Sequence, residues 1–219
     1  MSTWVWIGIA AIVFAVAVYA TLALSAPKGD GYKVLKGSQP GDKTTQSSAG
    51  LPRSFNEKEG AVYSWTGWVL VKNFASGFGQ RRRIFSRGDS PGLYIDSTSN
   101  SLIVVVNTYG TTPETILVSN IPAMKWVHVG IVVDQTAVSI YINGTLRIYH
   151  TLTQLPKQVD EPVKFGSQWD GVVGEVDYYP WALSNAEVFL KASKEPPPDL
   201  VKKPSSGSYF DITWYTGRI

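Results

Sequence analysis

The chain has 219 residues, enough for one domain of ordinary size with additional segments, or for two small domains. Charged residues make up only 17% of it and aromatic residues 12%, which favours an aromatic-rich β-type core over a helical bundle or a disordered chain. Cysteine is absent, which excludes disulfides, thiolate zinc sites, iron–sulfur clusters and a cysteine nucleophile. The net charge of +3 is too small to indicate nucleic acid, and no such partner is expected.

The first 25 residues carry no charged side chain, and residues 4–24 form an uninterrupted apolar run. A helix over this run would be about 31 Å long, which matches a bilayer hydrocarbon core of about 30 Å. Trp4, Trp6 and Tyr19 suit the two membrane interfaces. A cleaved signal peptide would need a basic start and a shorter apolar stretch, and a buried core helix would need covering elements nearby. We therefore predict one transmembrane α-helix as a membrane anchor within residues 1–25.

Residues 26–53 are rich in Gly, Ser, Pro, Thr and Lys, and they carry five basic and two acidic side chains. This composition predicts a flexible basic linker. Because basic residues follow the apolar run and none precedes it, the positive-inside rule predicts a single-pass protein with its body on the cytoplasmic side. The absence of cysteine agrees with a reducing compartment. The sequon Asn143-Gly144-Thr145 would argue for the opposite side, but Asn-Gly between two alternating runs also predicts a type I′ turn.

Between residues 61 and 148, apolar residues recur at every second position and turn signals follow at regular intervals. In residues 126–133, for example, the valines and the isoleucine fall on one face and His128 on the other. Many short strands with hairpin turns predict an all-β fold, an antiparallel two-sheet sandwich over residues 54–192. A helix is predicted near residues 184–191, with Ser184 as its cap and Glu187 at the capping-box position.

Several motifs in this region resemble laminin-G-like domains of the concanavalin A-like jelly-roll superfamily. They are Lys125-Trp126-Val127-His128-Val129, Val138-Ser139-Ile140-Tyr141-Ile142-Asn143-Gly144, Trp169-Asp170-Gly171 and Tyr179-Pro180-Trp181-Ala182-Leu183-Ser184. The resemblance covers about residues 55–192 and implies a jelly-roll sandwich. In one departure, Gly174-Glu175 stands where the family has an acidic pair, so any role of the first acid is lost.

We expect no enzymatic activity from this chain. Related jelly-roll glycoside hydrolases place two catalytic carboxylates on an E-x-D-x-x-E strand. Glu175 and Asp177 begin this pattern, but Pro180 occupies its last position. No Gly-x-Ser-x-Gly elbow accompanies His128 or His150. No cofactor is expected, although the resemblance implies calcium as the family's commoner inorganic ligand; the aspartates that could contribute, or that could instead form turns, are Asp89, Asp96, Asp134 and Asp170.

Two segments are candidates for binding a partner. Arg81, Arg82 and Arg83 form the densest basic run, which suits phosphate, a sulfated glycan or an acidic protein surface; a solvated loop or strand end is the alternative. Residues 193–219 form a Pro-rich and then aromatic C-terminal tail. Its aromatic side chains are expected either to fold back on the body or to dock on another chain; they are Tyr209, Phe210, Trp214 and Tyr215.

These features leave two hypotheses about function. In the first, the protein is a structural one that joins a lipid bilayer to protein neighbours in an assembly. An anchored chain with a laminin-G-like body resembles membrane-bound minor structural proteins of large DNA viruses. The resemblance implies a minor capsid protein on the internal membrane of the virion, with its body facing the capsid proteins. In the second hypothesis, the body is a membrane-displayed, lectin-like module that binds glycan. The cytoplasmic orientation, the missing disulfides and the aromatic tail favour the first.

Overall fold

The computed structural model describes residues 12–18, 29–47, 50–54 and 60–198. The chain divides into two units, one ending at Gly31 and one beginning at Tyr32. In the first unit, residues 12–18 are helical. Among the described residues, no helix is both long enough and apolar enough to cross a bilayer. The predicted anchor, including Trp4, Trp6 and Tyr19, otherwise lies outside the described residues and stays a prediction.

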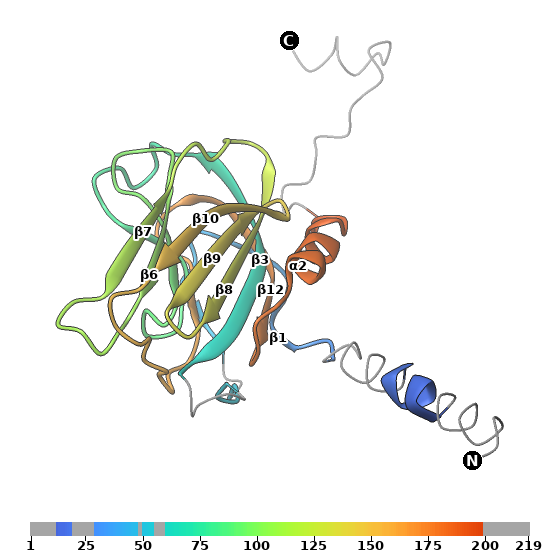
Figure 1. Ribbon diagram of the computed structural model, residues 1–219. Helices are drawn as coiled ribbons and strands as arrows, with labels where there is room; N and C mark the ends of the chain where they lie inside the picture. The colour runs from blue at the N-terminus through green and yellow to red at the C-terminus, as the bar shows by residue number, and fades with distance from the viewer. Residues whose placement is uncertain (1–11, 19–28, 48–49, 55–59, 199–219) are drawn as a thin grey trace, which may run out of the picture. The chain divides into compact units, whose positions relative to one another are not determined.

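The second unit is a sandwich of two antiparallel six-stranded sheets (Figure 1), which confirms the predicted fold class. Sheet A has the order β1 (Tyr32–Pro40), β12 (Asp170–Tyr179), β3 (Val62–Asn73), β8 (Trp126–Asp134), β9 (Ala137–Ile142) and β10 (Thr145–Thr151). Sheet B has the order β2 (Thr45–Gln46), β11 (Lys164–Phe165), β4 (Arg82–Ser86), β5 (Gly92–Ile95), β6 (Leu102–Val106) and β7 (Glu114–Val118).

The main core lies between the two sheets, where every second side chain of most strands points inward. In β8 the inward set is Val127, Val129, Ile131 and Val133, as the alternation predicts. Trp65 of β3 crosses the core and stacks on Phe85 of β4 at a ring distance of 5.4 Å and an angle of 24°. This aromatic pair therefore adds to the mainly aliphatic contact between the layers.

Residues 180–198, which include α2 (Asn185–Ala192), cover much of the outer face of sheet A, although Tyr149 of β10 is 65% exposed. The helix begins with the predicted capping box, in which Ser184 and Glu187 exchange hydrogen bonds. Its buried Val188 packs in a second apolar cluster with Tyr141 and Trp181. The buried Pro197 then lies over Gly174 of β12, so close that a Cβ at Gly174 would come within 2.4 Å of its ring.

The predicted boundaries of the sandwich differ from the structure at both ends. Its first strand begins at Tyr32, inside the segment predicted as a flexible linker, and β2 follows in the same segment. β1 is an edge strand with two register irregularities, so its apolar residues do not alternate strictly, and many of its polar side chains face solvent. At the other end, the covering segment continues to Pro198, whose carbonyl accepts a hydrogen bond from Ser38 at 3.0 Å.

Candidate functional site

In the described part of the chain, α2 packs on sheet A and no helix packs on the outer face of sheet B. Register aligns four outward side chains across it: Arg83 of β4 pairs with Tyr94 of β5, Tyr94 with Ile103 of β6, and Ile103 with Leu117 of β7. Leu117 is exposed and the other three are half-buried. We refer to these four residues as the sheet B row. The row combines a basic, an aromatic and an aliphatic part on one accessible surface.

Tyr94 occupies the centre of the sheet B row in a fixed position. Its ring lies over Gly92, where a Cβ would come within 2.5 Å of it, and its hydroxyl donates a hydrogen bond to the Asp89 carboxylate. The guanidinium of Arg81 lies 4.6 Å above the ring centroid, within the range of a cation–π contact. Burial and the hydrogen bond to Asp89 raise the pKa of Tyr94 to about 12, so the hydroxyl stays protonated at neutral pH.

The three consecutive arginines do not form one binding surface. Successive residues of a strand point to opposite faces, so Arg82 enters the sandwich while Arg83 faces outward. The buried Arg82 guanidinium donates to the carbonyls of Phe74 and Ser76, both at 2.6 Å, and to that of Asp96. Arg82 therefore holds two loops together and cannot reach a partner, contrary to the expectation from sequence. Arg81 remains exposed.

A pocket of about 570 Å³ lies at the end of the sandwich where β1 and β3 end and β12 begins. Its lining residues are Pro40, Asp42, Lys72, Asn73, Ser76, Trp169, Asp170, Gly171 and Val172. Trp169 is fully buried and fixed by packing, because a Cβ at Gly41 or Gly171 would lie within 2.4 Å of its ring. Its indole N–H donates to the carbonyl of Arg83 at 2.9 Å.

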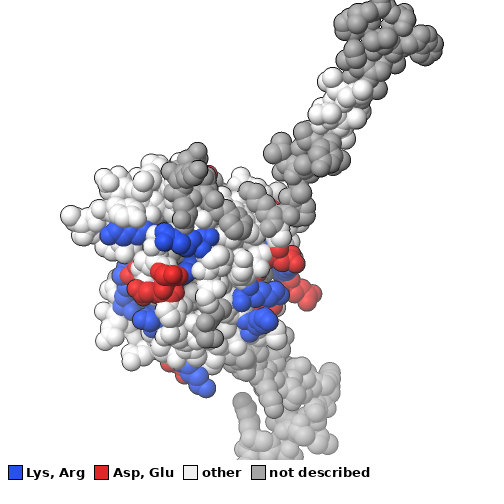
Figure 2. Space-filling view, turned by 90° about the horizontal axis from the view of Figure 1, so that it is seen from below, with Lys and Arg blue, Asp and Glu red and all other residues white. Residues whose placement is uncertain are grey.

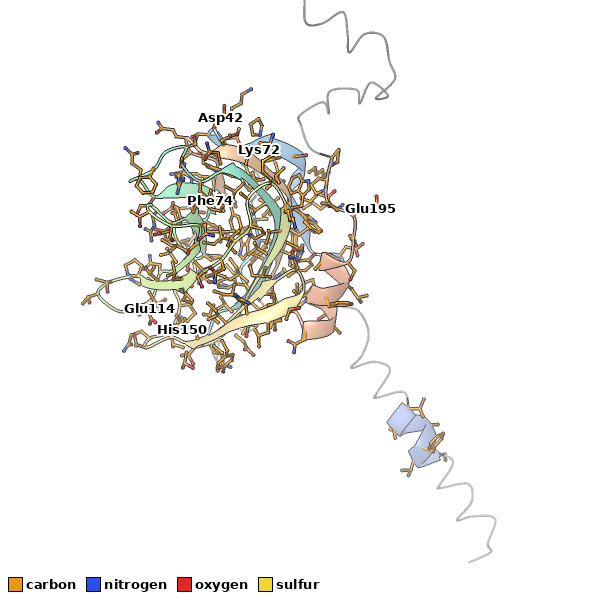
Figure 3. All side chains as sticks on the ribbon, turned by 90° about the horizontal axis from the view of Figure 1, so that it is seen from above. Asp42, Lys72, Phe74, Glu114, His150 and Glu195 are labelled. Atoms are coloured by element: carbon orange, nitrogen blue, oxygen red, sulfur yellow. The ribbon has the colours of Figure 1, made fainter. Side chains whose placement is uncertain are left out.

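Sequence reasoning did not find this pocket, because its polar side chains come from three distant segments. Asp42 follows β1, Lys72 is near the end of β3, and Asp170 begins β12; Figure 3 shows the first two near each other. The motif Trp169-Asp170-Gly171 was the one signal in the sequence that pointed to this place. The pocket offers two carboxylates, an ammonium and an amide to a ligand, a set that can both donate and accept hydrogen bonds.

The aspartates considered for calcium occupy separate places. Asp89 is bound to Tyr94, and Asp96 accepts hydrogen bonds from the backbone N–H groups of Thr98 at 3.2 Å and Ser99 at 2.9 Å. Asp134 ends β8, and Asp170 lines the pocket. Within the described ranges, no three His, Asp or Glu side chains are grouped as a metal site would need. Asp96 thus has the turn-forming role that was the alternative, whereas the Asp89 carboxylate holds the hydroxyl of Tyr94.

A histidine–carboxylate pair joins the free edges of the two sheets. Nε2 of His150 in β10 lies 2.9 Å from Oε2 of Glu114 in β7 (Figure 3). The other Glu114 oxygen accepts from the Thr153 backbone N–H at 2.6 Å and hydroxyl at 2.7 Å. Burial raises the pKa of Glu114, but the hydrogen bonds from His150 and Thr153 outweigh it and hold the pKa below its usual range. This pair connects the two layers and has no counterpart in the sequence motifs.

The incomplete glycosidase pattern lies at an irregularity of β12. Glu175 is exposed and has a positive φ of 45°, at the point where the pairing of β12 with β3 shifts register. Asp177 is half-buried, and burial raises its pKa. Pro180 is buried and supplies no acid. Glu175 therefore marks a β-bulge, a position that re-aims the strand.

Comparison with known families agrees with this architecture. The model of the Concanavalin A-like lectin/glucanases superfamily matches residues 43–189. The chain belongs to this superfamily. The matched region begins in the segment that sequence analysis predicted as a linker, as the position of β2 requires. No curated protein matches the sequence.

Solved structures of this superfamily fold include receptor-binding domains of bacterial toxins. The receptor binding domain of botulinum neurotoxin D has a TM-score of 0.57 at 11% identity, covering 76% of this chain and 46% of that one. The binding domain of botulinum neurotoxin DC in complex with rat synaptotagmin II has a TM-score of 0.54 at 13% identity, covering 71% and 46%. The chain spans about half the length of these domains, and at such identities the likeness shows the fold.

Proposed function

We propose that this superfamily member is a non-enzymatic binding module, held at a membrane by residues 1–25, that docks protein neighbours through the outer face of sheet B. The observation that carries the proposal is the difference between the two sheets. Residues 180–198 cover much of the outer face of sheet A, whereas no helix covers the sheet B row in the described part of the chain. A sandwich with one covered and one accessible face has a defined side for a partner.

The chemistry of the accessible face favours a protein partner with an acidic surface. Arg81 and Arg83 lie at one end of the row, and Lys164 of the neighbouring β11 is exposed beside β4. Guanidinium groups bind carboxylates through paired hydrogen bonds, and Arg and Tyr beside apolar residues are typical of protein interfaces. Ile103 and Leu117 supply the apolar part. The toxin domain of the same fold in complex with synaptotagmin II is a precedent for protein binding.

The finer proposal concerns the cellular setting. The uncharged run at residues 4–24, followed by basic residues, supports a single-pass anchor with the sandwich on the cytoplasmic side. This anchor and the laminin-G-like body together support the proposal that the chain is a minor capsid protein of a large DNA virus. In this role it would join the internal membrane of the virion to the protein shell. The aromatic side chains of Tyr209, Phe210, Trp214 and Tyr215 lie outside the described residues and remain proposed as a second docking element.

Crosslinking mass spectrometry of the full chain in its native membrane tests this proposal. We expect crosslinks from sheet B to acidic neighbours, and their loss in the double variant Arg81→Glu/Lys164→Glu. The matched control is Arg147→Glu/Lys125→Glu, which reverses two exposed charges away from sheet B. The proposal would be contradicted if the same crosslinks persisted in Arg81→Glu/Lys164→Glu. It would also be contradicted if the neighbours were crosslinked to the outer face of sheet A instead.

The pocket at the end of the sandwich supports a second candidate, binding of glycan. Its Asp42 and Asp170 carboxylates can accept hydrogen bonds from sugar hydroxyls, and Lys72 and Asn73 can donate to them. A glycan array with the full chain tests this function. A bound sugar whose signal is lost in Asp42→Asn and Asp170→Asn but kept in Asp134→Asn supports it, and the absence of any bound sugar refutes it.

A further inference from the structure

The start of β1 limits how far the sandwich can lie from a bilayer that holds the anchor. Seven residues, 25–31, separate the apolar run from Tyr32. Even fully extended, they span at most about 25 Å. The twelve residues of β3 alone extend for about 40 Å at the usual rise of a strand. The tether is therefore shorter than the sandwich, and the end where the chain enters must stay close to the membrane.

The pairing of the strands identifies that end. Tyr32 pairs with Tyr178 near the end of β12, and this is the end at which β3 begins and β8 finishes. The connection from β6 to β7, residues 107–113, and the connection from β10 to β11, residues 152–163, emerge there too, at the lower end in Figure 1. We refer to this end of the sandwich as the entry end.

The entry end projects an aromatic, an aliphatic and a basic side chain from a fixed backbone. Tyr109 is 69% exposed and Leu155 is 45% exposed. The Tyr109 N–H donates to the Leu155 carbonyl at 3.0 Å, and the bridge between Thr108 and Pro156 holds the two connections together. The Lys157 ammonium lies 5.5 Å from the Tyr109 ring centroid. Tyrosine and lysine beside an aliphatic residue are the side chains that proteins place at the headgroup level of a membrane.

We propose that the entry end is a lipid-contacting surface, with Tyr109, Leu155 and Lys157 in the headgroup layer of the bilayer that holds the anchor. This inference rests on the membrane anchor of the proposed function and adds an orientation to it. The sandwich then stands on the membrane with the pocket end pointing away. Docking partners would reach the sheet B row from the side.

The charge of the entry end indicates which lipids take part. Figure 2 shows this end, where Lys and Arg form separate patches beside Asp and Glu. Asp160 and Glu161 are exposed there, and Asp160 pairs with Arg87 at 3.3 Å. Because the charges are mixed, the contact depends on Tyr109 and Leu155 more than on attraction to anionic lipid. It is therefore expected with purely zwitterionic phosphatidylcholine.

The absence of cysteine allows a direct test by single-cysteine labelling of the full chain. An environment-sensitive fluorophore is attached at Tyr109→Cys or Leu155→Cys, and the protein is reconstituted into phosphatidylcholine vesicles with and without brominated lipid. The matched controls are Phe78→Cys and Met124→Cys, because these side chains are 63% and 69% exposed in connections at the opposite end. Val16→Cys reports on the anchor itself.

We expect brominated lipid to quench positions 109 and 155 several-fold more strongly than positions 78 and 124, and to quench position 16 as well. Suppose that position 16 is quenched, but positions 109 and 155 are quenched no more strongly than positions 78 and 124. This result would overturn the lipid contact of the entry end, while the membrane anchor would be supported. No quenching at position 16 would overturn the anchor, and the lipid contact with it.

Discussion

His128 shows how the surroundings of one side chain determine its chemistry. It is 2% exposed, its ring meets that of Trp68 edge-on at 5.1 Å, and its Nδ1 has no hydrogen-bond partner among the described residues. Burial, together with the positive charge of Lys191, lowers the pKa of His128 to about 4. The histidine of the Lys125–Val129 motif is therefore a buried, neutral side chain here.

The lowered pKa of His128 predicts a loss of stability in acid. Below pH 6.5 the unfolded chain binds a proton at this histidine and the folded chain does not, so the free energy of unfolding falls as the pH drops from 6.5 to 4. Because one pKa unit corresponds to about 1.4 kcal/mol, the loss by pH 4.5 is on the order of 2 to 3 kcal/mol. Urea unfolding at pH 7.5 and 4.5 should show this loss to be smaller in His128→Phe, which cannot titrate. An equal loss in both proteins would contradict the assignment.

At the scale of elements, the confirmed predictions are those that rest on local pattern. Asn143 and Gly144 have φ values of 51° and 80°, as a type I′ turn between β9 and β10 requires. β8 and the capped helix α2 also follow from alternation and capping. β1 was missed because an irregular edge strand has no clean alternation. The pocket was missed because Asp42, Lys72 and Asp170 meet only through pairing of strands distant in sequence.

Arg82 links the connection from β3 to β4 with the connection from β5 to β6 through its hydrogen bonds to three carbonyls. Replacing it by Met leaves these half-buried acceptors without the guanidinium donor, so we expect Arg82→Met to lower the free energy of unfolding by about 2 kcal/mol. The neighbouring Arg81→Met, at an exposed position, should change it by about 0.5 kcal/mol or less. Urea unfolding measures both. Similar losses in the two variants would mean that the loops do not depend on Arg82.

Gly174 allows the covering segment to lie on sheet A. A Cβ at this position would come within 2.4 Å of Pro197, so we expect Gly174→Ala to displace residues 194–198. Limited trypsin digestion followed by intact-mass analysis should then show faster cleavage after Lys194. Gly50→Ala is the matched control, because a Cβ there meets no atom within 4 Å. Unchanged cleavage in Gly174→Ala would show that the segment is not held at this glycine.

At the scale of the whole molecule, the sandwich is complete only with segments that composition assigns to a linker and a tail. A fragment of residues 54–192 lacks β1, β2 and the last six residues of the covering segment, so it exposes the edge of β12 and the surface of Gly174 that Pro197 covers. We expect a fragment of residues 29–198 to unfold in one cooperative transition and the 54–192 fragment to aggregate or to unfold at clearly lower urea. Equal midpoints would show that the added segments do not stabilise the sandwich.

The hydrogen bond between Ser38 and Pro198 has a mechanical consequence. The chain enters the sandwich at Tyr32, and the last described residue of the covering segment rests on the same strand, β1. Tension between the N-terminal and C-terminal segments would therefore be carried along β1 and its pairing with β12. Sheet B, including its outer face, would lie outside the path of the load. A protein attached at both ends could thus be pulled without distortion of the sheet B row.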